Sequence, residues 1–371
     1  MKPPADPKPR ALFLSPEVPS PGSGGGGLRS ASLLQYLQTK YSVDVAGFQL
    51  RRHSKAPAAR TWRNFARLVR GVPPLFDRYS GYEAQLQEQI GDARYALAVV
   101  EHFWCASYAA LLRPHCERLV IDLHNIESAL AETHAQAARW PVSWASLRFA
   151  AAYRRLERIW LPRFDTVLVT SEPDRKRIGH PRVFVYPNAL PEIRPPQVKE
   201  EECLVFSGNL EYHPNIEAVR WFRTEIWPRV RERCGEWRLV GKNPEAIAQL
   251  VSGDERIRLL GPVEDAVTEI ARAKICVVPL RSGSGTRFKI LEAWAAARAV
   301  VSTPLGAEGL EARDGEHLLI AGDPSRFAAH IERLCADAAL RDRLGAAGRA
   351  HYLRRFTWPV AWRCLDDAFR S

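Results

Sequence analysis

Residues 275–310 read ICVVPLRSGSGTRFKILEAWAAARAVVSTPLGAEGL, and this stretch decides the fold class that the sequence predicts. It opens with a β-rich apolar run at 275–280, passes through a turn of small residues into a helical pattern, and returns to an apolar run at 299–303. Short β-rich runs that alternate with helical stretches are typical of parallel α/β layers. The stretch therefore predicts a strand, a helix and a second strand of an α/β fold.

The same alternation continues through the chain on both sides of this stretch. Strands are predicted in a first series at 11–15, 42–48, 96–100, 119–123, 166–170 and 183–187, and in a second series at 203–207, 237–241, 257–261, 275–280, 299–303 and 317–321. Between the two series, 188–202 holds three prolines and a charge run, a composition typical of a linker. We therefore expect two Rossmann-like domains.

The domain boundaries follow from these patterns. We expect a disordered, proline-rich lead-in at 1–10, an N-terminal domain at 11–190, a linker at 191–202 and a C-terminal domain at 203–355. The amphipathic helix predicted at 356–370 has no third domain to join, so we expect 356–371 to pack back on the N-terminal domain. A chain of 371 residues is long enough for two cores, because single cores usually split beyond roughly 250–300 residues.

The composition favours a cytoplasmic protein. The seven cysteines are scattered without a C-x-x-C pair, which argues against a zinc site or a disulfide framework. No apolar run approaches the roughly 18 residues of a membrane span, and the N-terminus lacks the apolar core of a signal peptide.

The formal net charge of +11 is concentrated in the segment 51–78. This segment has one acid, Asp77, against eight basic residues, with Trp62, Phe65 and Leu68 among them. A helix at 59–70 would be basic with an apolar stripe, which suits an anionic membrane surface and would give a peripheral membrane protein. A solvated helix face stays open as the alternative. No nucleic-acid motif accompanies the charge, so we do not expect nucleic acid as a partner.

A glycine-rich stretch follows the first predicted strand, and a helix is predicted to start after it, near Leu28. Glycines at this point let a ligand approach the backbone closely, which predicts a phosphate-facing loop. A dinucleotide site is the competitor, but its acid at the end of the second strand is missing. A flexible surface loop is the other alternative. The candidate ligand-facing residues are Gly24, Gly25, Gly26 and Gly27.

Two polar residues, His124 and Asn125, directly follow the apolar strand at 119–123. Open α/β sheets bind their ligands at the carboxyl ends of strands. A histidine there can donate a hydrogen bond to a sugar hydroxyl or handle a proton. A helix-capping and packing role is the alternative.

The turn 281–287 is predicted to hold phosphate. Its small residues lead into the start of a helix, where exposed N–H groups and the helix dipole favour an anion. Arg287 and Lys289 add two positive charges, which suits a diphosphate, and Glu292 lies about one turn into the helix, where its carboxylate could bind two ribose hydroxyls. Gly208, after the strand at 203–207, could also expose its backbone to a phosphate.

These motifs together resemble the retaining GT-B glycosyltransferases, glycosyltransferase family four. The resemblance rests on EAWAAARAVVSTPLGAEGL (292–310), FSGNLEYHPNIEAVRWF (206–222), VGKNP (240–244), LGPVED (260–265), LHNIES (123–128) and VLVTSEPDRKRI (167–178). The bacterial branch that glycosylates lipid carriers or exopolysaccharide precursors is the most similar. The resemblance implies two Rossmann-like domains facing across a cleft, with the C-terminal helix crossing back. It also implies a nucleotide-diphosphate sugar donor, a glycan, lipid-linked or small-molecule acceptor, and no obligatory metal or cofactor.

We expect the following roles for individual residues, of which the resemblance itself assigns that of Glu292. Glu292 would bind the nucleotide ribose, Lys242 and Val263 would flank the base, and Gly208, Arg287 and Lys289 would hold the diphosphate. The glycine-rich loop and His124 would face the acceptor. The other substrate-binding candidates are Asn125, Asn209, Ser284, Gly285, Thr286 and Phe288.

Two departures from the family pattern bear on activity. The first glutamate of the family motif falls on Ser284, and the basic pair usual after the first strand of the C-terminal domain falls on Asn209 and Pro214. Arg287 and Lys289 are therefore the candidates to supply that charge. A catalytically inactive GT-B scaffold and a nucleotide-sugar epimerase remain alternatives to a glycosyltransferase.

Overall fold

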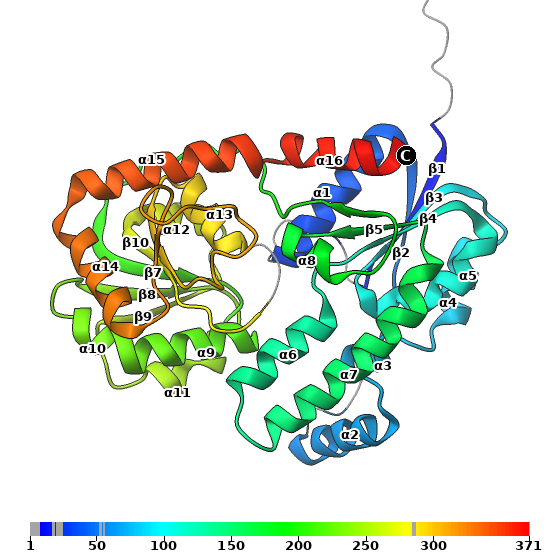
Figure 1. Ribbon diagram of the computed structural model, residues 1–371, viewed down its shortest axis with the longest axis horizontal. Coiled ribbons are helices and arrows are strands. Elements are labelled where there is room, and N and C mark those ends of the chain that lie inside the picture. The colour runs from blue at the N-terminus through cyan, green and yellow to red at the C-terminus, as the bar shows by residue number, and fades with distance from the viewer. Residues whose placement is uncertain are drawn as a thin grey trace, which may run out of the picture. The chain divides into compact units, whose positions relative to one another are not determined.

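The computed structural model describes residues 8–16, 19, 25–51, 54, 56–283 and 287–370. Contacts divide the chain into two units, one formed by Met1–Tyr186 with Cys364–Ser371 and the other by Pro187–Arg363. Each unit contains one six-stranded parallel sheet (Figure 1). All twelve strands predicted from the sequence are present, each within a few residues of its expected bounds.

The first unit is built on a sheet in the order β2-β1-β3-β4-β5-β6. Its strands are β1 (Arg10–Leu14), β2 (Ser42–Ala46), β3 (Tyr95–Glu101), β4 (Cys116–Asp122), β5 (Thr166–Val169) and β6 (Val183–Val185). The helices are α1 (Gly25–Lys40), α2 (Pro57–Arg70), α3 (Pro74–Arg78), α4 (Glu83–Ile90), α5 (Ala109–Leu112), α6 (Glu127–Ala137), α7 (Val142–Trp160) and α8 (Glu172–Arg177). Central strands such as β1 and β5 are apolar and buried along almost their whole length, as strands covered on both faces must be.

The second unit repeats this plan with the order β12-β11-β10-β7-β8-β9. Its strands are β7 (Glu201–Ser207), β8 (Glu236–Val240), β9 (Ile257–Gly261), β10 (Ala273–Val278), β11 (Ala299–Ser302) and β12 (Leu319–Ile320). The helices are α9 (His213–Trp221), α10 (Trp227–Val230), α11 (Ala248–Val251), α12 (Ala266–Arg272), α13 (Phe288–Ala295), α14 (Pro324–Ala336) and α15 (Ala338–Arg355). Asp265, Asp323 and Asp337 cap α12, α14 and α15 by accepting from backbone N–H groups of the first turn.

Each sheet has a point at which the chain reverses its direction across the sheet. In the first sheet β1 has β2 on one side and β3 on the other; in the second, β7 has β8 on one side and β10 on the other. Open α/β sheets bind ligands at such points, outside the carboxyl ends of the strands. Ser15 follows β1 here, and Gly208 follows β7.

Some predicted bounds differ from the observed ones. Helix α1 starts at Gly25 rather than near Leu28, so Gly25, Gly26 and Gly27 form its first turn, and Gly24 lies outside the described residues. Glycine carries no side chain that marks a helix start, and the first N–H groups of a helix have no partner within it in any case. Strand β7 likewise starts at Glu201, inside the stretch expected to be a linker.

The C-terminal helix, α16 (Trp358–Arg370), spans the boundary between the two units in sequence. From Cys364 onward it belongs to the first unit. There Asp366 accepts a hydrogen bond from the Tyr36 hydroxyl at 2.8 Å and forms an ion pair with Lys40. Its start belongs to the second unit, where the Trp358 amide donates to the Leu190 carbonyl.

Candidate active site

The site of the second unit begins at the loops that follow β7 and β8. Gly208 has a φ of +144° and Gly241 has a φ of +149°, conformations that favour glycine. A Cβ atom on Gly241 would lie 1.7 Å from the Gly208 carbonyl oxygen. The two loops therefore approach this closely only because residue 241 has no side chain.

Lys289 reaches into this loop from α13. Its Nζ atom donates to Asn215 Oδ1 at 3.2 Å and lies 5.3 Å from the centre of the Phe206 ring. A Cβ atom on Gly208 would lie 3.5 Å from the same Nζ. Asn215 is buried, and its Nδ2 donates to the Asn209 carbonyl at 2.7 Å. The fold thus brings together Gly208, Asn209 and Lys289, which the sequence analysis selected from two separate motifs.

The helix start carries two cations and one carboxylate. Arg287 is buried and directly precedes α13, and a Cβ atom on Gly283 would lie 3.3 Å from its Nη1. Burial, together with the charge of Arg287, lowers the pKa of Lys289 to about 8, although Glu292 opposes the shift. Burial raises the pKa of Glu292, while Lys289 and the Ser207 hydroxyl, which donates to Glu292 at 3.1 Å, act to lower it.

The remaining predicted residues of this unit lie at the start of α13 or on the loops after β8 and β9. Phe288 is the first residue of α13. Lys242 is exposed after β8, and Val263 is half-buried after β9, on loops farther along the sheet from its switch point. Three predicted residues lie outside the described part of the chain: Ser284, Gly285 and Thr286.

Sequence reasoning missed several residues that shape this site. Asn215 is one, and Ser282 is another, since its hydroxyl donates to Glu217 Oε2 at 2.6 Å and so ties the turn after β10 to α9. Ser282 belongs to the run of small residues that marked the turn, but nothing in the sequence indicates its partner 65 positions away.

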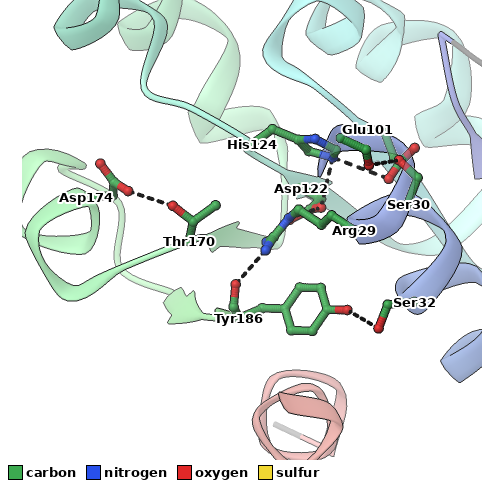
Figure 2. Close-up of polar contacts among 10 residues, drawn as sticks. Arg29, Ser30, Ser32, Glu101, Asp122, His124, Thr170, Asp174 and Tyr186 are labelled. Atoms are coloured by element: carbon green, nitrogen blue, oxygen red, sulfur yellow. Dashed lines mark hydrogen bonds and ion pairs between the residues drawn. The ribbon is translucent and has the colours of Figure 1, made fainter. Parts of the chain in front are cut away.

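The first unit has its own polar cluster at the carboxyl ends of β3 and β4 (Figure 2). Arg29, on α1, donates from Nε to Asp122 Oδ2 at 2.8 Å and from Nη2 to Oδ1 at 2.5 Å. Its third nitrogen donates to the Tyr186 carbonyl at 2.7 Å. Both charged side chains are almost completely buried. This bidentate pair fixes α1 against β4.

His124 extends the cluster to β3. Its Nε2 lies 3.4 Å from both Asp122 Oδ2 and Glu101 Oε1. Burial acts to lower the pKa of His124, but hydrogen bonds and charges of the two carboxylates outweigh it and raise that pKa. Ser15 donates to Glu101 Oε2 at 2.7 Å, across the switch point between β1 and β3. A Cβ on Gly26 would lie 3.8 Å from His124 Nδ1, so the predicted histidine and the glycine-rich helix start are neighbours.

Glu101, Asp122 and His124 also offer ligand atoms within 4.8 Å of one another, a spacing that could hold a metal ion. Both oxygens of Asp122 are already engaged by the Arg29 guanidinium. The Nε2 atom of His124 lies 3.4 Å from an oxygen of each carboxylate and is therefore already shared between them. The donor set therefore does not fit a further cation, and we assign no metal here.

His102 is a further feature of this edge that sequence reasoning missed. It directly follows β3 with a φ of +62°, and its ring stacks on Trp104 at 4.2 Å and lies 3.7 Å from the His124 ring. Burial and the charge of His124 lower its pKa. Trp104 in turn donates to Glu127, whose pKa burial raises to about 8. Asn125, which directly follows His124 in sequence, is half-buried.

Comparison with known proteins decides how the second unit is classified. Residues 201–337 match the family described as Glycosyl transferases group 1. The match lies within the second unit. The matched residues contain β7 to β12 and also Gly208, Arg287, Lys289 and Glu292.

Curated relatives of the group 1 domain match over part of their length. The chain is 29% identical over 184 residues to an uncharacterized 44.6 kDa protein in the cps region of Klebsiella pneumoniae, covering 45% of this chain and 46% of that protein. It is 35% identical over 128 residues to phosphatidyl-myo-inositol mannosyltransferase of Mycobacterium leprae, covering 33% of this chain and 34% of that protein. The matches thus span less than half the length of these relatives.

Solved structures match over the whole chain. Sucrose-phosphate synthase from Thermosynechococcus elongatus covers 98% of each chain with a TM-score of 0.70 at 18% identity. Anabaena HepE in complex with UDP and glucose covers 98% of this chain and 99% of its own, with a TM-score of 0.65 at 14% identity. The predicted fold class, a GT-B fold built from two Rossmann-like units, is confirmed.

Proposed function

We propose that the protein is a glycosyltransferase that uses a nucleotide-diphosphate sugar as its donor. The observation that carries the proposal is the position of Lys289, whose Nζ lies beside Gly208 in the loop after β7 and donates to Asn215 at the start of α9. The two basic residues that the family usually carries after this strand are replaced by Asn209 and Pro214 in this chain. Lys289 instead brings a positive charge from α13 to the loop after β7.

The donor diphosphate would lie between this loop and the start of α13. Backbone N–H groups and the helix dipole contribute only about half a unit of charge there. Negative charge grows on the leaving diphosphate as the sugar bond breaks, so preorganised full cations stabilise the transition state more than the ground state. Arg287 and Lys289 supply them, while Glu292 would hold the ribose and Lys242 and Val263 would flank the base. The UDP bound by Anabaena HepE supports a nucleotide donor on this fold.

The acceptor would bind at the first unit. His124 and the first turn of α1, with Gly26 close to the histidine ring, are the groups that would face it. A glycan or lipid-linked acceptor is supported by the mannosyltransferase relative, whose name specifies phosphatidyl-myo-inositol. We propose a retaining outcome from the resemblance to family four, to be tested by nuclear magnetic resonance of the anomeric product.

We also propose a cytoplasmic, peripheral attachment to an anionic membrane through the basic segment 51–78. Helix α2 forms half of this segment, and Trp62 and Phe65 on it are exposed. No described helix is long and apolar enough to cross a membrane.

A panel of nucleotide sugars tests the enzymatic proposal. The protein is incubated with each donor and a mixture of glycan and lipid-linked acceptors, and release of nucleoside diphosphate and transfer of labelled sugar are measured. A glycosyltransferase releases one nucleoside diphosphate for each sugar that it transfers to the acceptor, and the Lys289→Ala variant loses this activity. An inactive scaffold would bind nucleotide without release, and an epimerase would change the sugar while leaving it attached. Either result would overturn the proposal.

A further inference from the structure

Exposed apolar side chains gather in two segments of the first unit. Of the ten large hydrophobic side chains that are exposed among the described residues, eight lie on α2 or between residues 140 and 159. Apolar patches of this kind on a folded protein mark interaction sites. The two segments are in contact, because α2 packs against α7 (Figure 1).

Helix α2 turns its apolar stripe away from the protein. Trp62, Phe65 and Val69 recur at the spacing of one helix face, and they are 70%, 55% and 69% exposed. The Trp62 and Phe65 rings lie 5.9 Å apart. At 3.6 residues per turn, the arginines lie on the side of α2 roughly opposite this stripe. They are Arg60, Arg63, Arg67 and Arg70.

The second segment is the tip of the hairpin formed by α6 and α7. Trp140, at the tip, is 82% exposed. Val142, Trp144 and Leu147, at the start of α7, are each about half exposed. The sequence analysis did not select any of these residues, since tryptophan near a helix start is equally common in protein cores.

The charges around these side chains are almost entirely positive. Residues 56–78 and 138–160 contain ten arginines and two acidic residues. The first acid, Asp77, pairs with Arg67 at 2.8 Å and with Arg70 at 3.0 Å. The second, Glu157, accepts hydrogen bonds from the Ser128 amide and hydroxyl. Facing α7 from α6, Glu132 pairs with Arg154. An acidic surface is therefore the partner that these segments fit.

We propose that the tip of the α6–α7 hairpin inserts into an anionic lipid bilayer beside α2, so that the two segments form one membrane-binding face. This deepens the peripheral attachment proposed above and rests on it. Tryptophan is favoured at the interface of a bilayer, where its ring is buried and its N–H stays wet. Arginine stems can lie along the apolar surface while their guanidinium groups reach lipid phosphates. The stripe on α2 offers three exposed apolar side chains, and the tip adds four more.

Vesicle co-sedimentation of the full chain tests the proposal. The vesicles contain either phosphatidylcholine alone or an equimolar mixture with phosphatidylglycerol. The tip variant is Trp140→Ala/Trp144→Ala, and Val45→Ser, on exposed β2, is its apolar control. The charge variant is Arg148→Gln/Arg155→Gln on α7, and Arg313→Gln/Arg326→Gln, on the second unit, is its control.

We expect the wild-type chain to bind the phosphatidylglycerol vesicles and to bind neutral vesicles much more weakly. The tip variant should bind them about tenfold more weakly. Each arginine removed from α7 should weaken binding about fivefold, and added salt should reduce that difference. Neither control should change binding. Circular dichroism should show that the exposed substitutions leave the fold intact, and Trp144→Gln alone should reproduce part of the loss.

Tip variants that bind as tightly as the wild type would overturn the proposal. It would also be overturned if wild-type binding were equal on neutral and anionic vesicles. The wild-type chain could instead fail to bind vesicles but self-associate in sedimentation velocity. If the tip variant then lost this self-association, the face would bind a second copy of the chain and the proposal would be overturned. Sugar transfer to a water-soluble acceptor should be unchanged in the tip variant, so a failure of the enzymatic proposal remains distinguishable.

Discussion

Lys289 donates to Asn215 at 3.2 Å and thereby joins the start of α13 to the start of α9. The contact holds a cation above the loop after β7, where Gly208 leaves the backbone open. It relates two motifs that are 74 residues apart in the chain. The proposed donor site therefore depends on how α13 and α9 pack and not on the turn 281–287 alone.

The two cations should act together. Arg287→Ala and Lys289→Ala should each slow sugar transfer by about one to two decades, because a hydrogen bond to a charged group contributes about 1.5–3 kcal/mol. The double variant should lose more than the sum of the two, because one cation can partly cover for the other. Steady-state turnover with calorimetry of nucleoside diphosphate binding measures both effects. Lys176→Ala, at an exposed position of α8, is the control. Unchanged binding and turnover in both single variants would show that the diphosphate does not bind beside Arg287 and Lys289.

Nucleotide binding should depend on pH through Lys289, whose pKa is lowered to about 8. A diphosphate beside Nζ stabilises the charged form, so binding takes up a proton above that pH. The affinity should be constant below pH 8 and should fall as the pH rises through 8, approaching about tenfold per pH unit. Calorimetry in buffers of different ionisation enthalpy, on either side of this pH, reports the proton uptake. Lys289→Arg, which stays charged, should abolish it. Uptake that persists in this variant would assign the proton to another group.

Glu292 should affect the nucleoside and not the phosphates. Glu292→Ala should weaken nucleoside diphosphate binding by about ten- to a hundredfold, because hydrogen bonds from the ribose hydroxyls to a carboxylate are lost. Inorganic pyrophosphate, which has no ribose, should bind this variant as it binds the wild type. Lys289→Ala should weaken both ligands. If Glu292→Ala weakens pyrophosphate as strongly, the carboxylate acts by orienting Lys289 instead of binding ribose.

Gly241 should tolerate no side chain. Gly241→Ala places a Cβ atom against the Gly208 carbonyl, at a φ of +149°. Gly253 is the matched control, because it also has a positive φ but open space around its Cα. Gly241→Ala should lower the free energy of unfolding by at least about 2 kcal/mol more than Gly253→Ala. Urea denaturation compares the two, and equal losses would show that the loops after β7 and β8 can separate without cost.

Removing one partner of the buried Arg29–Asp122 pair should destabilise the protein much more than removing both. Asp122→Ala leaves the Arg29 guanidinium buried without its carboxylate and should cost about 3–5 kcal/mol of unfolding free energy. Arg29→Met/Asp122→Leu removes both charges and leaves Glu101 paired with His124, so it should cost much less. The comparison again uses urea denaturation. A double variant as unstable as Asp122→Ala would mean that the pair's hydrogen bonds, such as the one to Tyr186, carry the stability.

The strand series and the helix start at Arg287 follow from the sequence because their signals are local. Apolar runs between turn residues predict strands, and all twelve are found. Arg287, Lys289 and Glu292 fall within six residues, so one helix start necessarily groups them. The start of α1 was missed because a run of glycines has no side-chain pattern that marks where a helix begins.

Only the tertiary structure decides which distant groups meet. Arg29 and Asp122 are 93 residues apart, and they form a bidentate pair because β1 and β4 belong to one parallel sheet that α1 covers. A single sequence identifies each as a charged residue next to an apolar run, which equally describes an exposed surface. The partner, the burial and the resulting pKa values of Lys289 and His124 arise from packing, because electrostatic shifts depend on distance and desolvation and not on position in the chain.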